Sequence, residues 1–305
     1  MSLERKFVQL SKSLKGNLYT DQVAKLLYAT DASAYREVPT AVAIPENEDD
    51  IRKIIEFARN EHLNLIPRGA GTSLAGQVVG QGIVVDLSRN FRKILHVDEA
   101  NHAVTVQPGV VLDELNLHLK KYGLFFGPET STSNRCVIGG MLGNNSCGSH
   151  SIIYGSTRDH LNKVKAFLSD GSHVEFSDLT LKGFNDKCKG QTLEAGIYRQ
   201  HFDLLNHPAN QESIRAEFPD KEIRRRNNGY AIDILLETDP FANNTIPFNF
   251  SKLLAGSEGT LALANEIELN LVPLPPKEKA VICVHLNSVM EALYANLIAL
   301  KYSPG

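Results

Sequence analysis

Residues 66–82 read IPRGAGTSLAGQVVGQG, a stretch rich in glycine between two apolar runs. Glycine lets the backbone adopt positive φ angles and come close to a ligand. Consecutive backbone N–H groups in such a loop can form a concave anion site, to which Thr72 and Ser73 would add hydroxyl donors. The same composition is typical of a long flexible surface loop, and the glycines alone leave both interpretations open. The stretch fits neither a Rossmann nor a Walker A loop, because no helix is expected directly after it and no Gly-Lys-Ser/Thr follows.

The sequence around this loop predicts a small β-α-β-loop-β unit. Strands are expected at 40–44, 63–66 and 83–86. Between the first two, Asn47 can cap a helix in which apolar residues recur at helical spacing from Ile51 onward. The order of these elements indicates parallel strands.

A second group of elements predicts hairpins. Strands at 94–97 and 104–106 flank turn residues, and an Asp-Gly pair separates 164–168 from 173–176. Alternating sequence returns at 259–271 and predicts one more strand.

The remaining stretches are expected to hold less regular structure. A helix begins near Leu112 and ends at Gly123, whereas 178–250 is expected to contain few elements. A strand at 280–286 and a helix at 288–300 could not bury a core alone, so we expect the chain to stop at the threshold of another domain. The expected units are 1–95 with the N-terminal helices and first lobe, 96–276 as the second lobe, and 277–305 as the start of a cap domain.

Other polar motifs are candidate ligand contacts. Residues 138–149 (IGGMLGNNSCGS) and 154–159 (YGSTRD) could lie flat against a planar ligand, or form a tightly packed turn-helix-turn. Glu258, within LAGSEGTL, could contact a ligand or cap backbone amides. The run Arg224, Arg225 and Arg226 is usual on a solvated surface, but arginine also pairs carboxylates bidentately.

Composition excludes several classes of function. The 305 residues carry a net charge of -3, which gives no electrostatic argument for nucleic acid or an anionic membrane. No apolar stretch approaches the ~20 residues that span a bilayer. Neither C-x-x-C nor H-E-x-x-H occurs, so no metal site is expected. The cysteines would be free thiols in the cytoplasmic location that we expect: Cys136, Cys147, Cys188 and Cys283.

Taken in order, several strings resemble the vanillyl-alcohol-oxidase-like flavoproteins, in particular the FAD-linked oxidases related to D-lactate and glycolate dehydrogenases. They extend over about residues 40–275 and identify the family better than the substrate. The resemblance implies an α+β fold with two lobes, a small β-α-β lobe and a larger lobe with a mixed or antiparallel sheet. The matching strings are 66–74, 106–115, 123–130, 138–148, 154–160 and 256–261.

The resemblance also implies FAD as the cofactor, with its pyrophosphate between the lobes. Some relatives attach the flavin to a histidine in the first loop; because 69–73 contain none, we expect noncovalent FAD, and no bond is assigned to His150. The residues that the resemblance places beside FAD are Arg68, Gly69, Ala70, Gly71, Thr72, Ser73, Pro128, Glu129, Thr130, Gly139, Gly140, Asn144, Ser146, Gly148, Ser149, Gly155, Glu258 and Gly259.

The implied activity is oxidation of a 2-hydroxy acid such as D-lactate or glycolate, by hydride transfer to flavin N5. Arg224 to Arg226 could meet the substrate carboxylate, and no catalytic base is named. The strings GNNSCG and RRRNNGY resemble a longer subgroup with a cap domain and a C-terminal iron–sulfur region, which could accept electrons or bring the protein to a membrane surface. Two alternatives are a flavin-binding module that is inactive without those regions, and an NADPH-dependent reductase of the same fold.

Overall fold

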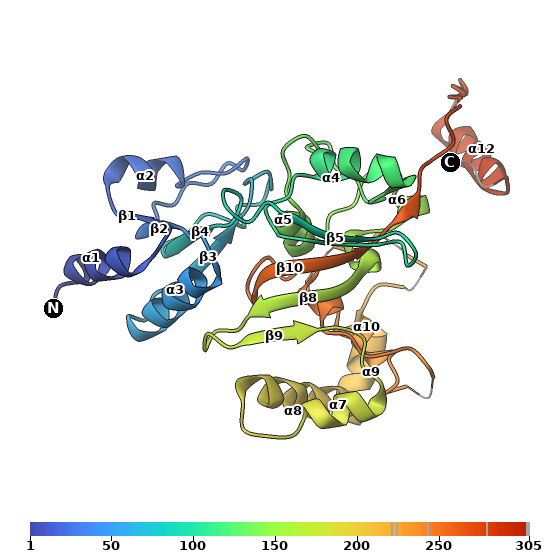
Figure 1. Cartoon of the computed structure of the whole chain (residues 1–305). Coiled ribbons are helices and arrows are strands. Elements are labelled where there is room, and N and C mark those ends of the chain that lie inside the picture. Colours follow the sequence, from blue (N-terminus) through green and yellow to red (C-terminus); the bar gives the residue numbers. More distant parts are fainter. Residues whose placement is uncertain (221, 224, 228, 243, 279, 303–305) are drawn as a thin grey trace.

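The computed structural model describes residues 1–220, 222–223, 225–227, 229–242, 244–278 and 280–302. Two lobes lie side by side, each built on its own β-sheet, and a C-terminal helix stands apart from both (Figure 1). The expected α+β class with two lobes is confirmed. No helix in the described part of the chain combines the length and the apolar character that crossing a bilayer requires.

The small lobe holds a four-stranded sheet in the order β1-β2-β4-β3. β2 and β4, and likewise β4 and β3, pair in parallel, as the sequence predicted, whereas β1 is antiparallel to β2. β3 ends at Arg68, where the glycine-rich loop begins. The strands are β1 (Asn17–Tyr19), β2 (Ala41–Ile44), β3 (Leu65–Arg68) and β4 (Ile83–Asp86).

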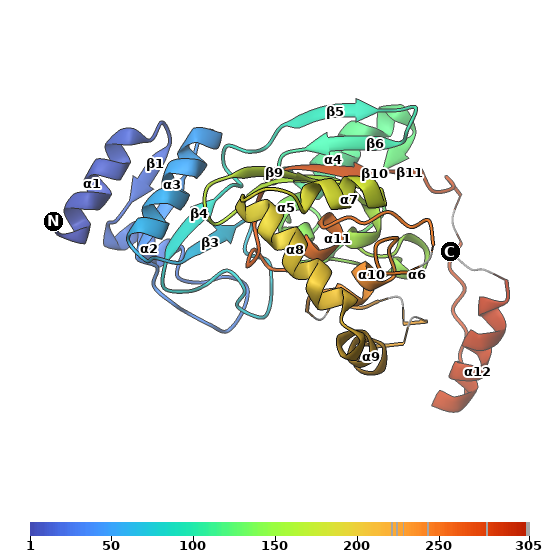
Figure 2. The same ribbon diagram turned by 90° about the horizontal axis from the view of Figure 1, so that it is seen from below.

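Two helices lie side by side against this sheet (Figures 1 and 2). The predicted cap is confirmed, since the Asn47 side chain accepts from the Asp50 backbone N–H at the start of α3. The apolar face of α3 is buried, and Phe57 lies 5.1 Å from Phe7 of α1, centroid to centroid. The helices are α1 (Leu3–Ser13), α2 (Gln22–Leu27) and α3 (Glu48–Asn60).

The large lobe holds a five-stranded antiparallel sheet in the order β5-β6-β10-β8-β9. Both predicted hairpins, β5–β6 and β8–β9, are confirmed. The predicted strand at 259–271 is β10, but it begins only at Leu263, because Gly259 has a φ of +78° in the preceding turn. The strands are β5 (Ile94–Asp98), β6 (Ala103–Val106), β8 (Leu161–Phe167), β9 (His173–Phe176) and β10 (Leu263–Asn270).

Short helices of the large lobe carry several of the motifs. The predicted helix after Leu112 is confirmed and ends at Gly123, whose φ is +69°. β7 (Leu124–Phe125) and β11 (Val272–Pro273) form a separate two-stranded pair. The other short helical segments are α4 (Leu112–Leu119), η1 (Lys120–Tyr122), α5 (Ile138–Asn144), α6 (Ser151–Tyr154), η2 (Thr157–His160) and α11 (Ser251–Leu254).

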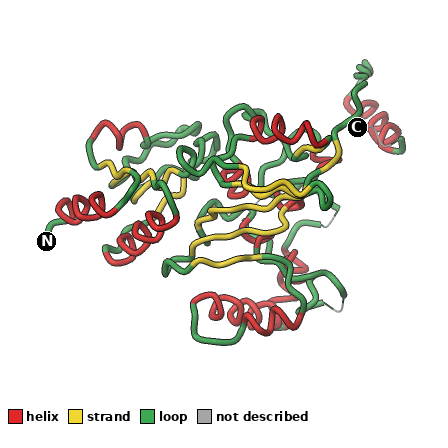
Figure 3. Tube along the Cα trace, in the orientation of Figure 1, coloured by secondary structure: helices red, strands yellow, loops and turns green. Residues whose placement is uncertain are grey.

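The expectation of few elements in 178–250 is wrong, because the described residues of this stretch form four helices (Figure 3). Thr180 and Thr192 cap two of its helices, and Phe184 and Tyr198 enter an aromatic cluster with Phe248. Its polar composition hid a helical spacing of apolar residues. The helices are α7 (Leu181–Lys187), α8 (Leu193–Asn206), α9 (Pro208–Glu217) and α10 (Ile232–Leu236).

The strand expected at 280–286 is also wrong. These residues have no ladder partner in the described chain, and a strand needs one to satisfy its backbone groups. Val281 and Ile282 are accordingly 91% and 85% exposed. The helix expected after them is confirmed as α12 (Val289–Leu300), with Ser288 as its N-cap.

Contacts of the large lobe fix the relative position of the two lobes. Phe167 at the end of β8 is buried in the core of the small lobe, together with Leu263 of β10. Asn265 donates to the Glu48 carboxylate at 2.8 Å, and Arg52 lies over the Phe167 ring. Because these contacts join α3 to the central strands of the other sheet, the loops between the lobes face each other across a defined gap.

Candidate cofactor-binding site

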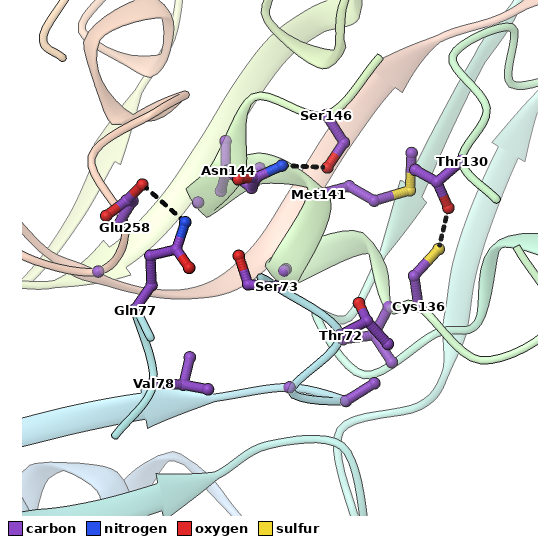
Figure 4. Close-up of a pocket in the computed structure, with 18 of the residues that line it drawn as sticks. Thr72, Ser73, Gln77, Val78, Thr130, Cys136, Met141, Asn144, Ser146 and Glu258 are labelled. Atoms are coloured by element: carbon purple, nitrogen blue, oxygen red, sulfur yellow. Dashed lines mark hydrogen bonds between the residues drawn. The ribbon is translucent and has the colours of Figure 1, made fainter. Parts of the chain in front are cut away.

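A cavity of about 750 Å³ lies between the lobes. Its walls are the loop 67–78 of the small lobe and two segments of the large lobe, 136–149 and 254–264 (Figure 4). The volume falls within the ~300–1,000 Å³ that is usual for small-molecule sites. The glycine-rich stretches that lie far apart in the sequence therefore meet around one cavity.

The first wall offers free backbone donors. Among the described residues, no acceptor contacts the backbone N–H groups of Gly69 to Leu74. A run of consecutive unpaired N–H groups is suited to bind an anion, since each group contributes a partial positive charge. Thr72 and Ser73, whose side chains are drawn in Figure 4, add hydroxyl groups to the same wall. This loop therefore fits a pyrophosphate.

Arg68 supports the loop from behind. Its guanidinium donates to the carbonyls of Tyr28 (3.2 Å) and Thr30 (2.8 Å), and it lies over the Tyr28 ring. Burial lowers the pKa of this guanidinium. At Gly71, where φ is +66°, a Cβ would lie only 2.8 Å from an Arg68 nitrogen. The charge of Arg68 thus stabilises the shape of the loop through two carbonyl contacts.

Helix α5 forms the second wall and carries glycines of two kinds. At Gly139 a Cβ would lie 2.5 Å from the Pro108 Cβ, so close packing within the protein requires glycine there. At Gly140 the nearest atom would be a Val137 methyl at 3.7 Å, and at Gly143 the nearest would be 3.6 Å away. Both of these glycines line the cavity. The room that they leave belongs to the cavity and fits a ligand lying against the helix.

The chain beyond α5 continues this wall. Asn144 donates to the Ser146 hydroxyl at 3.0 Å, and both line the cavity. No acceptor in the described chain contacts the N–H groups of Cys147, Gly148 and Ser149. At Gly148 a Cβ would lie 2.3 Å from the Glu129 Cγ, so this turn packs directly on the preceding segment.

Some of the predicted contacts lie behind the wall. Thr130 lines the cavity, but Pro128, Glu129 and Gly155 are not among its lining residues. Glu129 accepts from the Ser149 hydroxyl and from His150, each at 2.6 Å. Burial opposes its ionisation, yet these hydrogen bonds outweigh burial and lower the pKa of its carboxyl. A Cβ at Gly155 would meet the Asp159 carboxylate instead of the cavity.

The third wall is the turn that contains Glu258 and Gly259, both of which line the cavity. Gln77 of the opposite lobe donates to the Glu258 carboxylate at 3.2 Å (Figure 4). No backbone N–H in the described residues donates to that carboxylate, so the interpretation of Glu258 as a cap of backbone amides is wrong.

The described arginines of the run 224–226 lie in different environments. Arg225 lines the cavity, whereas Arg226 forms an ion pair with Asp233 outside it. Arg224 lies outside the described residues. Asn227, which also lines the cavity, donates weakly to the Cys147 sulfur at 3.5 Å. Arg225 is therefore the member of the run that can meet a ligand in the cavity.

Sequence reasoning missed several residues of the cavity. Gln77 and Val78 belong to the glycine-rich stretch itself and could have been found by extending the site beyond Ser73. Cys136 lines the cavity close to the Thr130 hydroxyl, and burial raises the pKa of its thiol. No sequence pattern indicated that Cys136 would line the cavity. No group of three or more metal-ligating side chains lies together in the described part of the chain.

Comparison with known proteins agrees with this geometry. Residues 39–177 match the model of a family described as FAD binding domain. D-2-hydroxyglutarate dehydrogenase of Pseudomonas putida is 33% identical over 286 residues, which are 93% of this chain and 27% of that protein. The corresponding protein of Escherichia coli K12 is 33% identical over 281 residues, 91% of this chain and 27% of that protein.

A shorter relative is glycolate oxidase subunit GlcD of Bacillus subtilis, 26% identical over 94% of this chain and 49% of that subunit. The chain thus spans about a quarter of the length of the dehydrogenases and about half of GlcD. A solved alkyldihydroxyacetonephosphate synthase shares the fold, with a TM-score of 0.58 at 17% identity over 88% of this chain and 41% of that one. The expected resemblance to FAD-linked oxidases is confirmed, and the match to an FAD-binding family supports FAD as the cofactor.

Proposed function

We propose that this chain, whose residues 39–177 match a family described as FAD binding domain, is the flavin-binding part of an enzyme that oxidises a 2-hydroxy acid. The enzyme would be an FAD-dependent dehydrogenase or oxidase acting on CH–OH groups. D-lactate and glycolate are the expected substrates, and D-2-hydroxyglutarate joins them because the relatives with 33% identity are named for it.

One observation carries the cofactor part of the proposal. The free N–H groups of Gly69 to Leu74 and of Cys147 to Ser149 belong to two walls of one cavity, and Gly140 and Gly143 leave room along its side. These backbone groups would hold the pyrophosphate and line the rest of the cofactor. No histidine is among the described residues that line the cavity, which supports noncovalent binding.

Bound FAD would supply a two-electron acceptor for the hydride of the substrate α-carbon. The contribution of this chain is to bind and orient. Arg225 could pair the substrate carboxylate bidentately. Apolar lining residues such as Val137, Met141 and Leu254 would exclude water, which strengthens every polar interaction in the site.

The share of the relatives' length that the chain covers supports a second candidate function. Because about a quarter of the dehydrogenase length is present, substrate contacts and the electron acceptor could lie in regions beyond this chain. The chain would then be a flavin-binding module without activity of its own. We propose that the longer protein is cytoplasmic and contacts a membrane peripherally. Its electron acceptor would be an iron–sulfur region.

The test begins with the visible spectrum of the purified protein before and after acid precipitation. Flavin absorbance that moves to the supernatant supports noncovalent FAD, whereas colour in the pellet refutes it. The FAD-loaded protein is then mixed anaerobically with D-lactate, glycolate, D-2-hydroxyglutarate or NADPH. Bleaching by a hydroxy acid supports the enzyme. Bleaching by NADPH alone supports the reductase, and no bleaching by any of them supports the module.

A further inference from the structure

Glu258 occupies a backbone conformation in which a glycine would be less strained. In the turn 256–259, φ is positive at Gly256 (+88°), Glu258 (+53°) and Gly259 (+78°). The turn is fixed to α5, because the Glu258 N–H donates to the Gly143 carbonyl at 2.9 Å. An unfavourable conformation at a non-glycine residue points to a role for its side chain.

The charge of Glu258 is unusual for its surroundings. It is the sole carboxylate among the described residues that line the cavity, and it forms no ion pair with them. A cavity that binds a pyrophosphate would repel a second negative group close to the phosphates. The carboxylate is therefore suited to a part of the cofactor that donates hydrogen bonds. The sugar hydroxyls of FAD are such donors, and carboxylates bind ribose hydroxyls in other dinucleotide sites.

The present partner of Glu258 reaches it from the other lobe. Gln77 Nε2 donates to Glu258 Oε1 at 3.2 Å, while Gln77 Oε1 accepts from the Ala75 N–H at 3.3 Å. Gln77 follows the anion-binding loop, and Figure 4 shows the two side chains meeting across the cavity. The amide thus takes the acceptor position that a hydroxyl of a bound ligand would need.

We propose that Glu258 binds a sugar hydroxyl of FAD, and that this hydroxyl displaces the Gln77 amide when the cofactor enters. The inference rests on the proposed function only in taking FAD as the ligand. Glu258 is then a determinant of cofactor affinity, whereas Gln77 is its competitor in the ligand-free protein. The two side chains have opposite roles, although they form one hydrogen bond.

The experiment is an FAD titration of the ligand-free 305-residue chain, followed by flavin fluorescence, for the wild type, Glu258→Gln and Gln77→Ala. We expect Glu258→Gln to weaken FAD binding about tenfold, since the charged acceptor of the hydrogen bond becomes a neutral amide oxygen. Gln77→Ala should lower the Kd, because the cofactor no longer has to displace the amide. Glu175→Gln, on the exposed face of β9, is the matched control and should bind FAD as the wild type does.

Competition by ADP and by FMN distinguishes the two sugars. If the partner is the adenosine ribose, Glu258→Gln weakens ADP and spares FMN; if it is the ribityl chain, the reverse holds. Unchanged binding of FAD, ADP and FMN by Glu258→Gln would overturn the inference. Equal weakening of FAD by Glu258→Gln and Gln77→Ala would also overturn it, because the bridge would then only hold the walls together. A folded wild type that binds no FAD refutes the cofactor assignment and the inference together.

Discussion

Gly140→Ala separates the needs of the protein from those of its ligand. In the ligand-free protein the added methyl group would meet only Val137, at 3.7 Å, which is an ordinary van der Waals distance. Replacing a helical glycine with alanine stabilises the fold by about 0.5–1 kcal/mol. With FAD in the cavity, the same methyl group would overfill the wall and cost about 1–3 kcal/mol, which corresponds to a Kd about 5- to 140-fold higher.

Two assays measure these opposite effects. Urea denaturation of the ligand-free protein gives the change in free energy of unfolding, and FAD titration gives the change in Kd. Gly196→Ala in α8 is the control, because its nearest neighbour is a flexible arginine nitrogen at 4.0 Å and it does not line the cavity. It should gain stability and keep its FAD affinity. If Gly140→Ala binds FAD as tightly as the wild type, the cofactor does not lie against this part of α5.

Three further outcomes follow from particular contacts. Partial burial of the Tyr28 hydroxyl and its hydrogen bond to Asp86 raise the pKa of Tyr28 to about 12. This raised pKa stabilises the fold below pH ~10, and the contribution is lost as the pH rises toward 12. Tyr28→Phe should therefore flatten the alkaline loss of stability seen by circular dichroism. Asp50→Asn should lower the free energy of unfolding by about 2–3 kcal/mol in urea denaturation, because the buried carboxylate accepts three backbone N–H groups; a loss below 0.5 kcal/mol would contradict this. Arg225→Ala should raise the KM of a full-length enzyme for its hydroxy acid about tenfold or more, while FAD affinity stays unchanged; an unchanged KM would remove Arg225 from the substrate site.

Sequence patterns predicted the helix ends and hairpin turns, because these depend on residues that are close together in the sequence. Asn47 as a cap, Gly123 as a helix end and the Asp-Gly hairpin at 170–171 all act within a few residues of themselves. The helices within 178–250 were missed because their burial depends on aromatic residues such as Phe248, which come later in the chain. The strand expected at 280–286 failed for the opposite reason, since a β-rich sequence forms no strand without a neighbour to pair with.

For the site, sequence reasoning found the segments but not the direction of each side chain. Arg68 lines the cavity, and its guanidinium donates to the carbonyls of Tyr28 and Thr30. Only the folded chain brings residue 28 next to residue 68, so no local pattern could reveal this. The meeting of Gln77 with Glu258 depends likewise on the packing of the two lobes.

These contacts explain how a cavity with little side-chain charge can bind a dianion. Each wall is fixed from behind: Arg68 holds the first loop, Glu129 packs against Gly148, and Arg158 donates to the Ala255 carbonyl at 2.5 Å just before the Glu258 turn. The ionised groups thus order the backbone, and the backbone N–H groups remain for the ligand. Donors that are already oriented need little reorganisation when an anion arrives, so binding loses less entropy than it would with mobile lysine or arginine side chains. Glycine serves these walls in two ways, because Gly139 and Gly148 allow close packing within the protein while Gly140 and Gly143 leave room in the cavity.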